Sequence, residues 1–209
     1  MQRIGLTGGI AAGKSVAARR LAELGAVLID HDQLGREAVA PGSAGLDAVA
    51  EAFGPEVVGP DGALDRPALA RIVFSDPGAL ARLNAVVHPI IMRLSAEREA
   101  ASATADPGAV IVHDIPLLVE TGQADAFHLL VVVHAPAEVR VRRLVDLRRM
   151  TPEEAAARVA SQATDDQRLA AADVVLDGTR DDTHLRAQVD ELWRRLVAER
   201  LEELEAERA

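Results

Sequence analysis

The chain has 209 residues, which is long enough to bury a full core, and this length fits one domain with insertions better than two independent domains. It carries 33 acidic and 23 basic side chains, and the net charge of -10 argues against nucleic acid as a partner, because a phosphate backbone dominates such binding. Cysteine is absent, which excludes disulfides, thiolate chemistry and zinc sites built on cysteine.

Short apolar runs alternate with helical segments along the chain. The first run, residues 3–7, predicts a strand, and after a glycine-rich turn the pattern of residues 15–24 predicts a helix. Further buried strands are expected over residues 26–30, 109–113, 128–134 and 173–176. Because helical segments separate them, the strands indicate an α/β fold with a parallel five-stranded sheet and right-handed crossovers.

Residues 33–106 form a stretch that is too long for a simple crossover between the second and third strands. The stretch is rich in Ala, Leu and Arg, and turn or proline signals break it at Pro41-Gly42, Gly59 to Gly62, Asp76-Pro77 and His88-Pro89. We therefore expect a mainly helical insertion that can cover the carboxyl edge of the sheet, where open α/β folds bind ligands.

A second insertion, residues 137–162, is rich in arginine and restarts at Thr151-Pro152, where Thr can cap a helix and Pro can take its first position. This pattern predicts a mobile helical lid. A charged helix over residues 183–208 finishes the chain. The predicted core consists of the remaining segments, about residues 1–32, 107–136 and 163–209.

Gly8 and, four residues later, Gly13-Lys14-Ser15 have the spacing of a Walker A loop, placed between a strand and a helix. Backbone N–H groups and the helix N-terminus form an anion cradle there, Lys14 reaches the β and γ phosphates of a nucleotide, and the Ser15 hydroxyl coordinates Mg²⁺. Lys14 is the only lysine of the chain, which indicates a site that needs a compact charge instead of the broad fork of arginine. The alternative is a glycine-rich turn without a ligand.

The segment Asp30-His31-Asp32 comes at the end of the second predicted strand. A carboxylate there can accept the proton of a substrate hydroxyl, as phosphoryl transfer requires. The alternative is that Asp32 only caps a helix that starts near Gln33, with Asp30 ending the strand. The pattern alone favours neither reading.

Asp114 follows the third predicted strand, where P-loop enzymes often carry an acidic residue near Mg²⁺. Pro116 can equally be a strand terminator before an apolar helix start, and this reading is slightly favoured. A lone histidine before proline, such as His88, is more often a packed helix end than a ligand.

Arg140 and Arg143 lie one helical turn apart in the second insertion and share a face. They can clamp a transferring phosphoryl group when the lid closes, since positive charge neutralises the oxygens of the transition state. The alternative is a solvated face with Glu138 and Asp146 as partial partners, and the charge pattern alone favours it.

Several groups of residues occur in a fixed order between residue 3 and about residue 178. They are Leu6-Thr7-Gly8-Gly9-Ile10 with Gly13-Lys14-Ser15, Ile29-Asp30-His31-Asp32 with Arg36, Leu83-Asn84 with His88-Pro89, Pro116 to Glu120, Arg143-Leu144, Gln162 and Ala172-Asp173. Their order and spacing resemble the dephospho-CoA kinase family. The combination is far more specific than the Walker A loop alone.

The resemblance implies transfer of the γ-phosphate of ATP to the ribose 3'-hydroxyl of dephospho-CoA, with Mg²⁺. It implies a three-layer P-loop fold like that of nucleoside monophosphate kinases, with a helical CoA-binding insertion and a lid. It also implies that Asp32 is the base and that Lys14 and Arg140 stabilise the transferring phosphate. The implied ATP contacts are Gly8, Gly9, Ala11, Ala12, Gly13, Lys14, Ser15, Val16 and Arg143, and the implied acceptor contacts are Thr7, Asp32, Arg36, His88, Pro116 and Leu117.

The chain departs from the family at three points. Ala11 stands where the family usually has Gly, so the backbone there must be one that alanine can adopt. Leu147 stands where the lid commonly has Arg, so either Arg148 substitutes through a local distortion or one phosphate contact is missing. Gly178 stands where the family often has Asn near the adenine, which leaves recognition of the base open.

Other functions remain to be weighed against this one. A P-loop kinase of another small hydroxyl or nucleotide acceptor would share the Walker A loop, but the Asp-x-Asp, His-Pro and Pro-Leu-Leu segments argue against it. A GTPase commonly uses an Asn-Lys-x-Asp motif, which cannot exist in a chain whose only lysine is Lys14. A CoA-binding module without catalysis is disfavoured because Lys14, Ser15 and Asp32 are retained.

The longest apolar run of strand type, residues 129–133, is far too short to span a bilayer, and residues 1–4 lead into structured sequence instead of a signal peptide. We therefore expect a cytoplasmic protein with no membrane partner. We expect a monomer or a weak homo-oligomer.

Overall fold

A computed structural model describes residues 1–206 and contains one five-stranded sheet in the order β2-β3-β1-β4-β5. Strand β1 pairs in parallel with β3 and with β4, and β4 pairs in parallel with β5. The strands are β1 (Gln2–Gly8), β2 (Val27–Asp30), β3 (Val110–Asp114), β4 (Leu129–His134) and β5 (Val174–Asp177). The predicted α/β fold with a parallel sheet is confirmed, and every predicted strand lies within one residue of its observed bounds.

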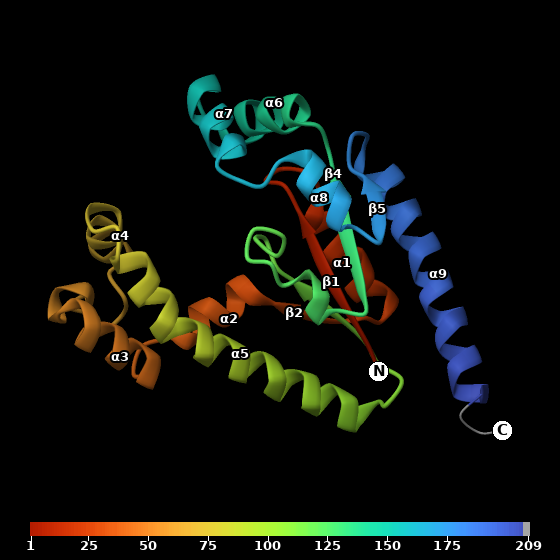
Figure 1. The fold of residues 1–209 in the computed structure, drawn as a ribbon, viewed down its shortest axis with the longest axis horizontal. Helices are drawn as coiled ribbons and strands as arrows, with labels where there is room; N and C mark the ends of the chain where they lie inside the picture. Colours follow the sequence, from red (N-terminus) through yellow and green to blue (C-terminus); the bar gives the residue numbers. More distant parts are fainter. Residues whose placement is uncertain (207–209) are drawn as a thin grey trace. The chain divides into compact units, whose positions relative to one another are not determined.

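The chain divides into two compact units, one made of Met1–Ile29 with Ser102–Ala209 and the other of Asp30–Ala101. The first unit holds most of the sheet and the helical elements α1 (Lys14–Leu24), η2 (Ala124–Ala126), α6 (Ala137–Arg148), α7 (Pro152–Ala160), α8 (Asp165–Ala171) and α9 (Asp182–Ala206). Figure 1 shows these helices around the sheet. Residues 207 and 208 of the predicted last helix lie outside the described residues. The assignment of a single domain with an insertion and a lid stays a prediction.

Alternate side chains of β4 point to opposite faces of the sheet, as the pleat of a strand requires. Val131 and Val133 belong to a core cluster with residues of α1 and α9, such as Leu21 and Leu192. Leu130 and Val132 belong to a second cluster, against which the end of α8 packs. The first unit therefore has helices on both faces of its sheet, which gives three layers.

Helix α7 begins where the sequence predicts. Thr151 is its N-cap, and the Thr151 hydroxyl accepts a hydrogen bond from the Glu154 backbone N–H while the Glu154 carboxylate accepts one from the Thr151 N–H. Pro152 takes the first helical position, where no backbone N–H is needed. The predicted cap and restart are confirmed.

The second unit is mainly helical and contains α2 (His31–Ala38), α3 (Ala44–Phe53), η1 (Pro55–Val57), α4 (Arg66–Ser75) and most of α5 (Ala79–Ala105). Its own core is formed by Val49, Phe53, Val57 and Leu69. The predicted breaks before α3, α4 and α5 are confirmed.

The predicted break at His88-Pro89 is wrong, because Pro89 lies inside the 27-residue helix α5. Proline removes one backbone hydrogen bond and strains the preceding turn, but a helix of this length keeps many other bonds. Among the described helices, none combines the length and the apolar character needed to span a membrane.

Candidate active site

The glycine-rich loop lies between the end of β1 at Gly8 and the start of α1 at Lys14. Gly13 is the N-cap of α1 and has a φ of 113°, a left-handed conformation that glycine adopts without strain. The loop is closed by a hydrogen bond from the Ala12 N–H to the Gly9 carbonyl at 3.0 Å. The first N–H groups of a helix have no carbonyl partner within it, so the start of α1 can bind an anion.

Lys14 forms an ion pair with Asp114, the last residue of β3. Strand β3 is a direct neighbour of β1, so parallel pairing brings the carboxyl ends of both strands to the same edge of the sheet. The side chains of Lys14 and Asp114 are 16% and 12% exposed. The lysine ammonium and one carboxylate are therefore held next to the glycine-rich loop.

Arg140 of α6 is 2% exposed, although most arginine side chains lie in solvent. Its Nε donates to the Ala135 carbonyl at 2.9 Å and its Nη2 donates to Asp165 Oδ1 at 2.7 Å. A Cβ atom on Gly9 would lie 2.5 Å from Nη1 of Arg140, so the guanidinium packs directly against the glycine-rich loop. The alternative of a solvated face is wrong for Arg140, because its carboxylate partner comes from α8.

Arg143 contacts the loop in a different way. Its Nη1 donates to the carbonyls of Ala11 at 3.1 Å and Ala12 at 3.4 Å, and its Nη2 donates to the carbonyl of Arg180 at 3.1 Å. Arg143 therefore links the glycine-rich loop to the segment that follows β5. These side-chain hydrogen bonds go to backbone oxygens, so Arg143 helps to fix the shape of the loop.

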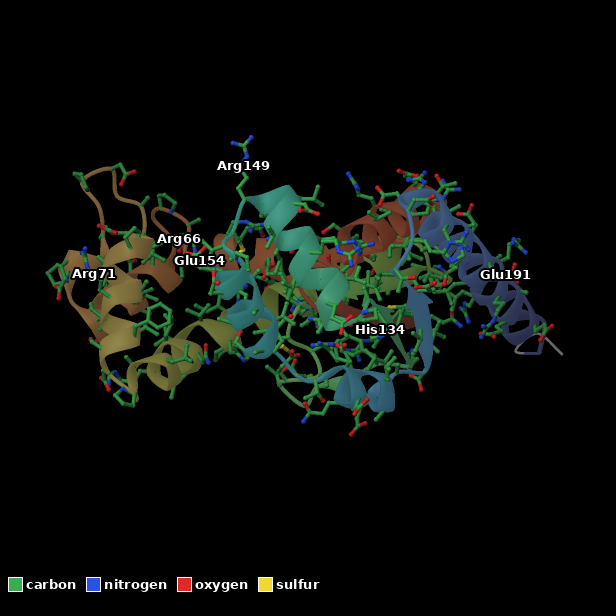
Figure 2. All side chains as sticks on the ribbon, turned by 90° about the horizontal axis from the view of Figure 1, so that it is seen from above. Arg66, Arg71, His134, Arg149, Glu154 and Glu191 are labelled. Atoms are coloured by element: carbon green, nitrogen blue, oxygen red, sulfur yellow. The ribbon has the colours of Figure 1, made fainter. Side chains whose placement is uncertain are left out.

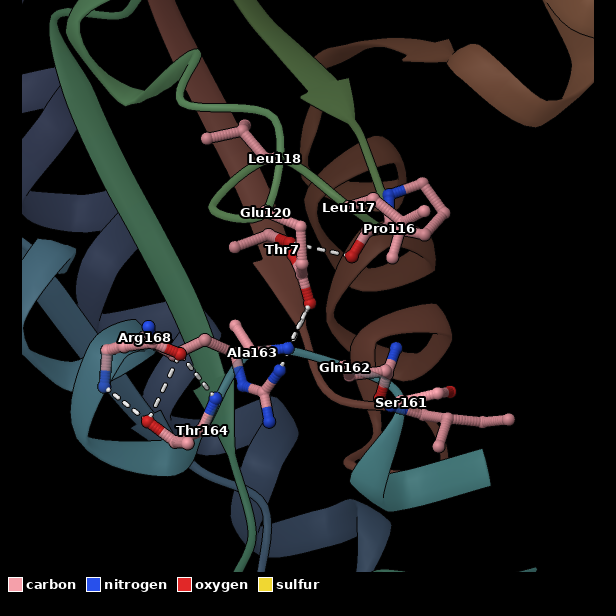
Figure 3. Close-up of polar contacts among 12 residues, drawn as sticks. Thr7, Pro116, Leu117, Leu118, Glu120, Ser161, Gln162, Ala163, Thr164 and Arg168 are labelled. Carbon is pink, nitrogen blue, oxygen red and sulfur yellow. Dashed lines mark hydrogen bonds and ion pairs between the residues drawn. The ribbon is translucent and has the colours of Figure 1, made fainter. Parts of the chain in front are cut away.

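Thr7, which precedes the loop, is 1% exposed. Its hydroxyl donates a hydrogen bond of 3.2 Å to the carbonyl of Pro116, as Figure 3 shows. Leu117 follows and is 47% exposed, which is high for a leucine. The structure thus brings the three predicted acceptor contacts of the first unit together beside the end of β1.

The remaining predicted acceptor contacts, Asp32, Arg36 and His88, belong to the second unit and are all exposed. Helix α2 begins at His31, and its N-cap is Asp30, whose Oδ1 accepts from the Gln33 N–H at 2.9 Å. The alternative in which Asp32 caps a helix starting near Gln33 is therefore wrong. Asp32 lies in the first turn of α2, so its carboxylate is not used as the cap.

His31 lies between the two carboxylates of this segment. Burial lowers the pKa of His31, and the nearby charge of His88 lowers it further, while the charges of Asp30 and Asp32 raise it. The net direction is downward, so His31 is neutral at neutral pH.

Within residues 1–206 no group of three or more His, Cys, Asp or Glu side chains forms a metal cage. Mg²⁺ does not need such a cage, because it commonly binds through substrate phosphates, water and one or two protein oxygens. The exposed Ser15 hydroxyl at the start of α1 and the Asp114 carboxylate beside Lys14 supply oxygen atoms of this type. The residues present fit a magnesium ion that arrives with a nucleotide.

The family model for dephospho-CoA kinase matches residues 2–183. The chain belongs to the dephospho-CoA kinase family. It is 53% identical over 195 residues to a dephospho-CoA kinase of Leifsonia xyli, covering 92% of this chain and 98% of the relative. It is 54% identical over 197 residues to a dephospho-CoA kinase of Streptomyces avermitilis, covering 94% and 95%. The solved structure of a dephospho-CoA kinase from Campylobacter jejuni has the same fold, with a TM-score of 0.65, 21% identity, and coverage of 93% and 97%.

The departures from the dephospho-CoA kinase family have local structural explanations. Ala11 has a φ of 61°, so alanine adopts here the left-handed conformation that the usual glycine adopts freely. A Cβ atom on Gly178 would overlap the Ala12 carbonyl oxygen and lie 3.1 Å from the His134 carbonyl oxygen. Glycine therefore allows the segment after β5 to contact the glycine-rich loop, which an asparagine at this backbone position would prevent.

The third departure from the family lies on α6. The helix runs unbroken through Leu147 to Arg148, and Leu147 is 78% exposed. Arg149 ends the helix with a φ of 55°, and its side chain projects away from α6 in Figure 2. The suggested local distortion that would let Arg148 replace an arginine at position 147 is therefore not present.

A set of four charged residues around two buried arginines, Arg140 and Arg168, was missed by the sequence predictions. Arg168 of α8 forms ion pairs with Asp165 of the same helix and with Glu120 after β3, and Asp165 also pairs with Arg140. Burial raises the pKa of Asp165, but the hydrogen bond from Arg168 and the charge of Arg140 outweigh this effect and lower it. A capping pattern at Thr164 marks the start of α8 in the sequence, but nothing in the sequence indicates that Arg168 is buried.

Proposed function

We propose that the protein transfers the γ-phosphoryl group of ATP to the ribose 3'-hydroxyl of dephospho-CoA, giving coenzyme A and ADP. The observation that carries this proposal is the family match over residues 2–183 in a chain that has Gly8, Gly13, Lys14 and Ser15 at the Walker A spacing. The packing of Arg140 against Gly9 supports it, because a second fixed cation then lies next to the loop.

Phosphoryl transfer depends mainly on positioning and on stabilisation of charge on the transferring group. In this proposal the backbone N–H groups of the loop and of the start of α1 hold the phosphates, and Lys14 and Arg140 neutralise the oxygens of the transition state. Arg140 is already buried and held by hydrogen bonds, so it needs little reorganisation when the phosphate arrives. Arg143 keeps the loop in shape through the carbonyls of Ala11 and Ala12.

Asp32 is proposed to accept the proton of the acceptor hydroxyl. Its carboxylate is exposed and is not the cap of α2, so it is available for this role. Thr7, Arg36, His88, Pro116 and Leu117 are proposed to contact the acceptor. We further propose that the Ser15 hydroxyl would hold Mg²⁺, which would supply positive charge to offset the negative charge of the ATP phosphates.

We also propose that the protein works in the cytoplasm without a nucleic-acid or membrane partner, as a monomer or a weak homo-oligomer. The net charge of -10 supports the exclusion of nucleic acid, because like charges repel. Sedimentation at several protein concentrations measures the oligomeric state. A stable dimer or larger assembly at all concentrations would contradict this part of the proposal.

The reaction itself is tested by identifying its product. The purified protein is incubated with ATP, MgCl₂ and dephospho-CoA, and phosphorus NMR locates the new phosphate. We expect a monoester on the 3' oxygen of the ribose, formed in equal amount to ADP. ADP release without a phosphorylated acceptor, or a phosphate at another position, would contradict the proposed reaction.

A further inference from the structure

Two buried arginines in the first unit share a single carboxylate oxygen. Arg140 Nη2 and Arg168 Nη2 both donate to Asp165 Oδ1, at 2.7 Å and 3.1 Å. Each arginine residue is only 2% exposed. Two guanidinium groups so close together repel each other, and water cannot screen them when they are buried. The negative charge of Asp165, which contacts both guanidinium groups, offsets this repulsion.

Arg168 and Glu120 in turn fix the position of Asp165. Glu120 Oε1 accepts hydrogen bonds from Arg168 Nη1 at 3.4 Å and from the Ala163 N–H at 2.9 Å, and Figure 3 shows Glu120 reaching this segment. The hydrogen bonds between Thr164 and Gln167 close a capping box directly before and within the first turn of α8. The capping box and the hydrogen bond from the Ala163 N–H to Glu120 thus fix the start of α8, where Asp165 lies.

The orientation of Arg140 follows from these contacts. Nε donates to the Ala135 carbonyl and Nη2 donates to Asp165, and these two hydrogen bonds restrict the orientation of the guanidinium. Nη1 is then directed toward Gly9 of the phosphate-binding loop. Gln162 links the loop to Arg140, because its Oε1 accepts from the Ile10 N–H at 2.8 Å and lies 3.5 Å from Arg140 Nη1. A flexible arginine is in this way kept in one orientation toward the loop.

We propose that Asp165 is a positioning residue that orients Arg140 toward the transferring phosphate, with Arg168 and Glu120 as its support. This inference rests on the proposed function, in which Arg140 stabilises the phosphoryl group. Preorganised charge lowers the barrier without reorganisation during the reaction, so loss of orientation reduces turnover more than it weakens ground-state binding.

The test compares Asp165→Asn with Asp166→Asn, its exposed neighbour on the same helical turn. Both changes remove one negative charge from the start of α8, but only the first removes the carboxylate that Arg140 and Arg168 share. We expect kcat to fall about tenfold or more in Asp165→Asn, with the Kd for ATP changed by less than about threefold. Asp166→Asn should keep kcat within about twofold of the native value. Native kcat in folded Asp165→Asn, or an equal loss in Asp166→Asn, would overturn the inference.

A double-mutant cycle separates orientation of Arg140 from a structural role. If Asp165 acts through Arg140, Asp165→Asn should change kcat by less than about twofold in an Arg140→Ala background. A multiplicative further loss there would overturn the inference while leaving the role of Arg140 intact. Native kcat in Arg140→Ala would instead contradict the role of Arg140 in the proposed function.

A second variant covers the case in which Asp165→Asn is too unstable to assay. Asp165→Asn combined with Arg168→Gln removes one charge of each sign, so the net charge around Arg140 is unchanged and stability should return. Arg140 still lacks its carboxylate partner in this double variant, so kcat should remain low by about tenfold. Recovery of native kcat would overturn the positioning role, because charge balance alone would then be sufficient.

Discussion

Lys14, the only lysine of the chain, lies at the end of the glycine-rich loop and is paired with Asp114. We expect Lys14→Ala to lower kcat by about a hundredfold or more, since it removes one charge from the transition state. Lys14→Arg should also be severely impaired, because a planar fork cannot replace a compact charge in a tight loop. Steady-state kinetics with thermal unfolding as a folding check measures both. Arg19→Ala, which removes an exposed cation from the same helix, is the matched control. Native turnover in folded Lys14→Ala, or an arginine variant that works equally well, would contradict this role.

Asp32 and Asp30 are separated by one residue but have different structural roles, since only Asp30 caps α2. We expect Asp32→Asn to lower turnover by roughly a hundredfold, the scale for losing a positioned general base, while stability and ATP binding change little. Asp30→Asn is the control, because asparagine caps a helix about as well as aspartate. Measurement of kcat and of ATP affinity for both variants decides the matter. Native turnover in Asp32→Asn would move the assignment to Asp30 or Asp114.

At the scale of the elements, the contact between the glycine-rich loop and α6 depends on the absence of a side chain at Gly9. A Cβ atom there would meet Arg140 Nη1 at 2.5 Å and Cζ at 2.8 Å. Arg140 cannot move aside easily, because Ala135 and Asp165 hold it. We expect Gly9→Ala to lower kcat by about tenfold or more, since a misplaced charge stabilises the transition state poorly.

Gly35→Ala in α2 is a suitable control for Gly9→Ala, because the nearest atom to its added Cβ would lie 3.7 Å away, an ordinary contact. That variant should keep kcat near native. If Gly9→Ala had native kcat, the packing of Arg140 against the loop would have no catalytic consequence.

The conformation of Ala11 predicts a change in stability. Its φ of 61° is a left-handed value that costs an alanine about 1–2 kcal/mol relative to glycine. Glycine also makes the unfolded chain more flexible, which offsets about 0.4–1 kcal/mol of the gain. We therefore expect Ala11→Gly to increase the free energy of unfolding by about 0.5–1 kcal/mol. Chemical denaturation measures this difference, and a loss of stability would show that the strain at Ala11 is relieved in another way.

The strands and most helix ends could be predicted because their signals are local. Buried apolar runs mark β1 and β4, and Thr151-Pro152 marks the start of α7. Pro89 misled the prediction of α5, because helix length compensates for a lost hydrogen bond and the sequence does not show that balance. The sequence leaves the cap of α2 open between Asp30 and Asp32, because an aspartate at either position can cap a helix that starts one residue later.

At the scale of the whole molecule, each compact unit has its own core and carries part of the proposed set of functional residues. The loop and its lysine could be predicted from spacing, because their chemistry resides in contiguous residues. The burial of Arg140 could not, because its partners Asp165 and Ala135 are brought to it by tertiary packing of α6 and α8. The charge pattern along α6 favours a solvated face, but Arg140 is buried because it pairs with Asp165 of α8.

The most direct test of the central claim is the choice of acceptor. ADP release is measured with dephospho-CoA, AMP, adenosine and shikimate offered in turn, under conditions that report kcat/KM. We expect dephospho-CoA to exceed every other acceptor by at least about a hundredfold, the scale of discrimination that several lost acceptor contacts produce. A kcat/KM for AMP, adenosine or shikimate equal to or above that for dephospho-CoA would contradict the proposed function.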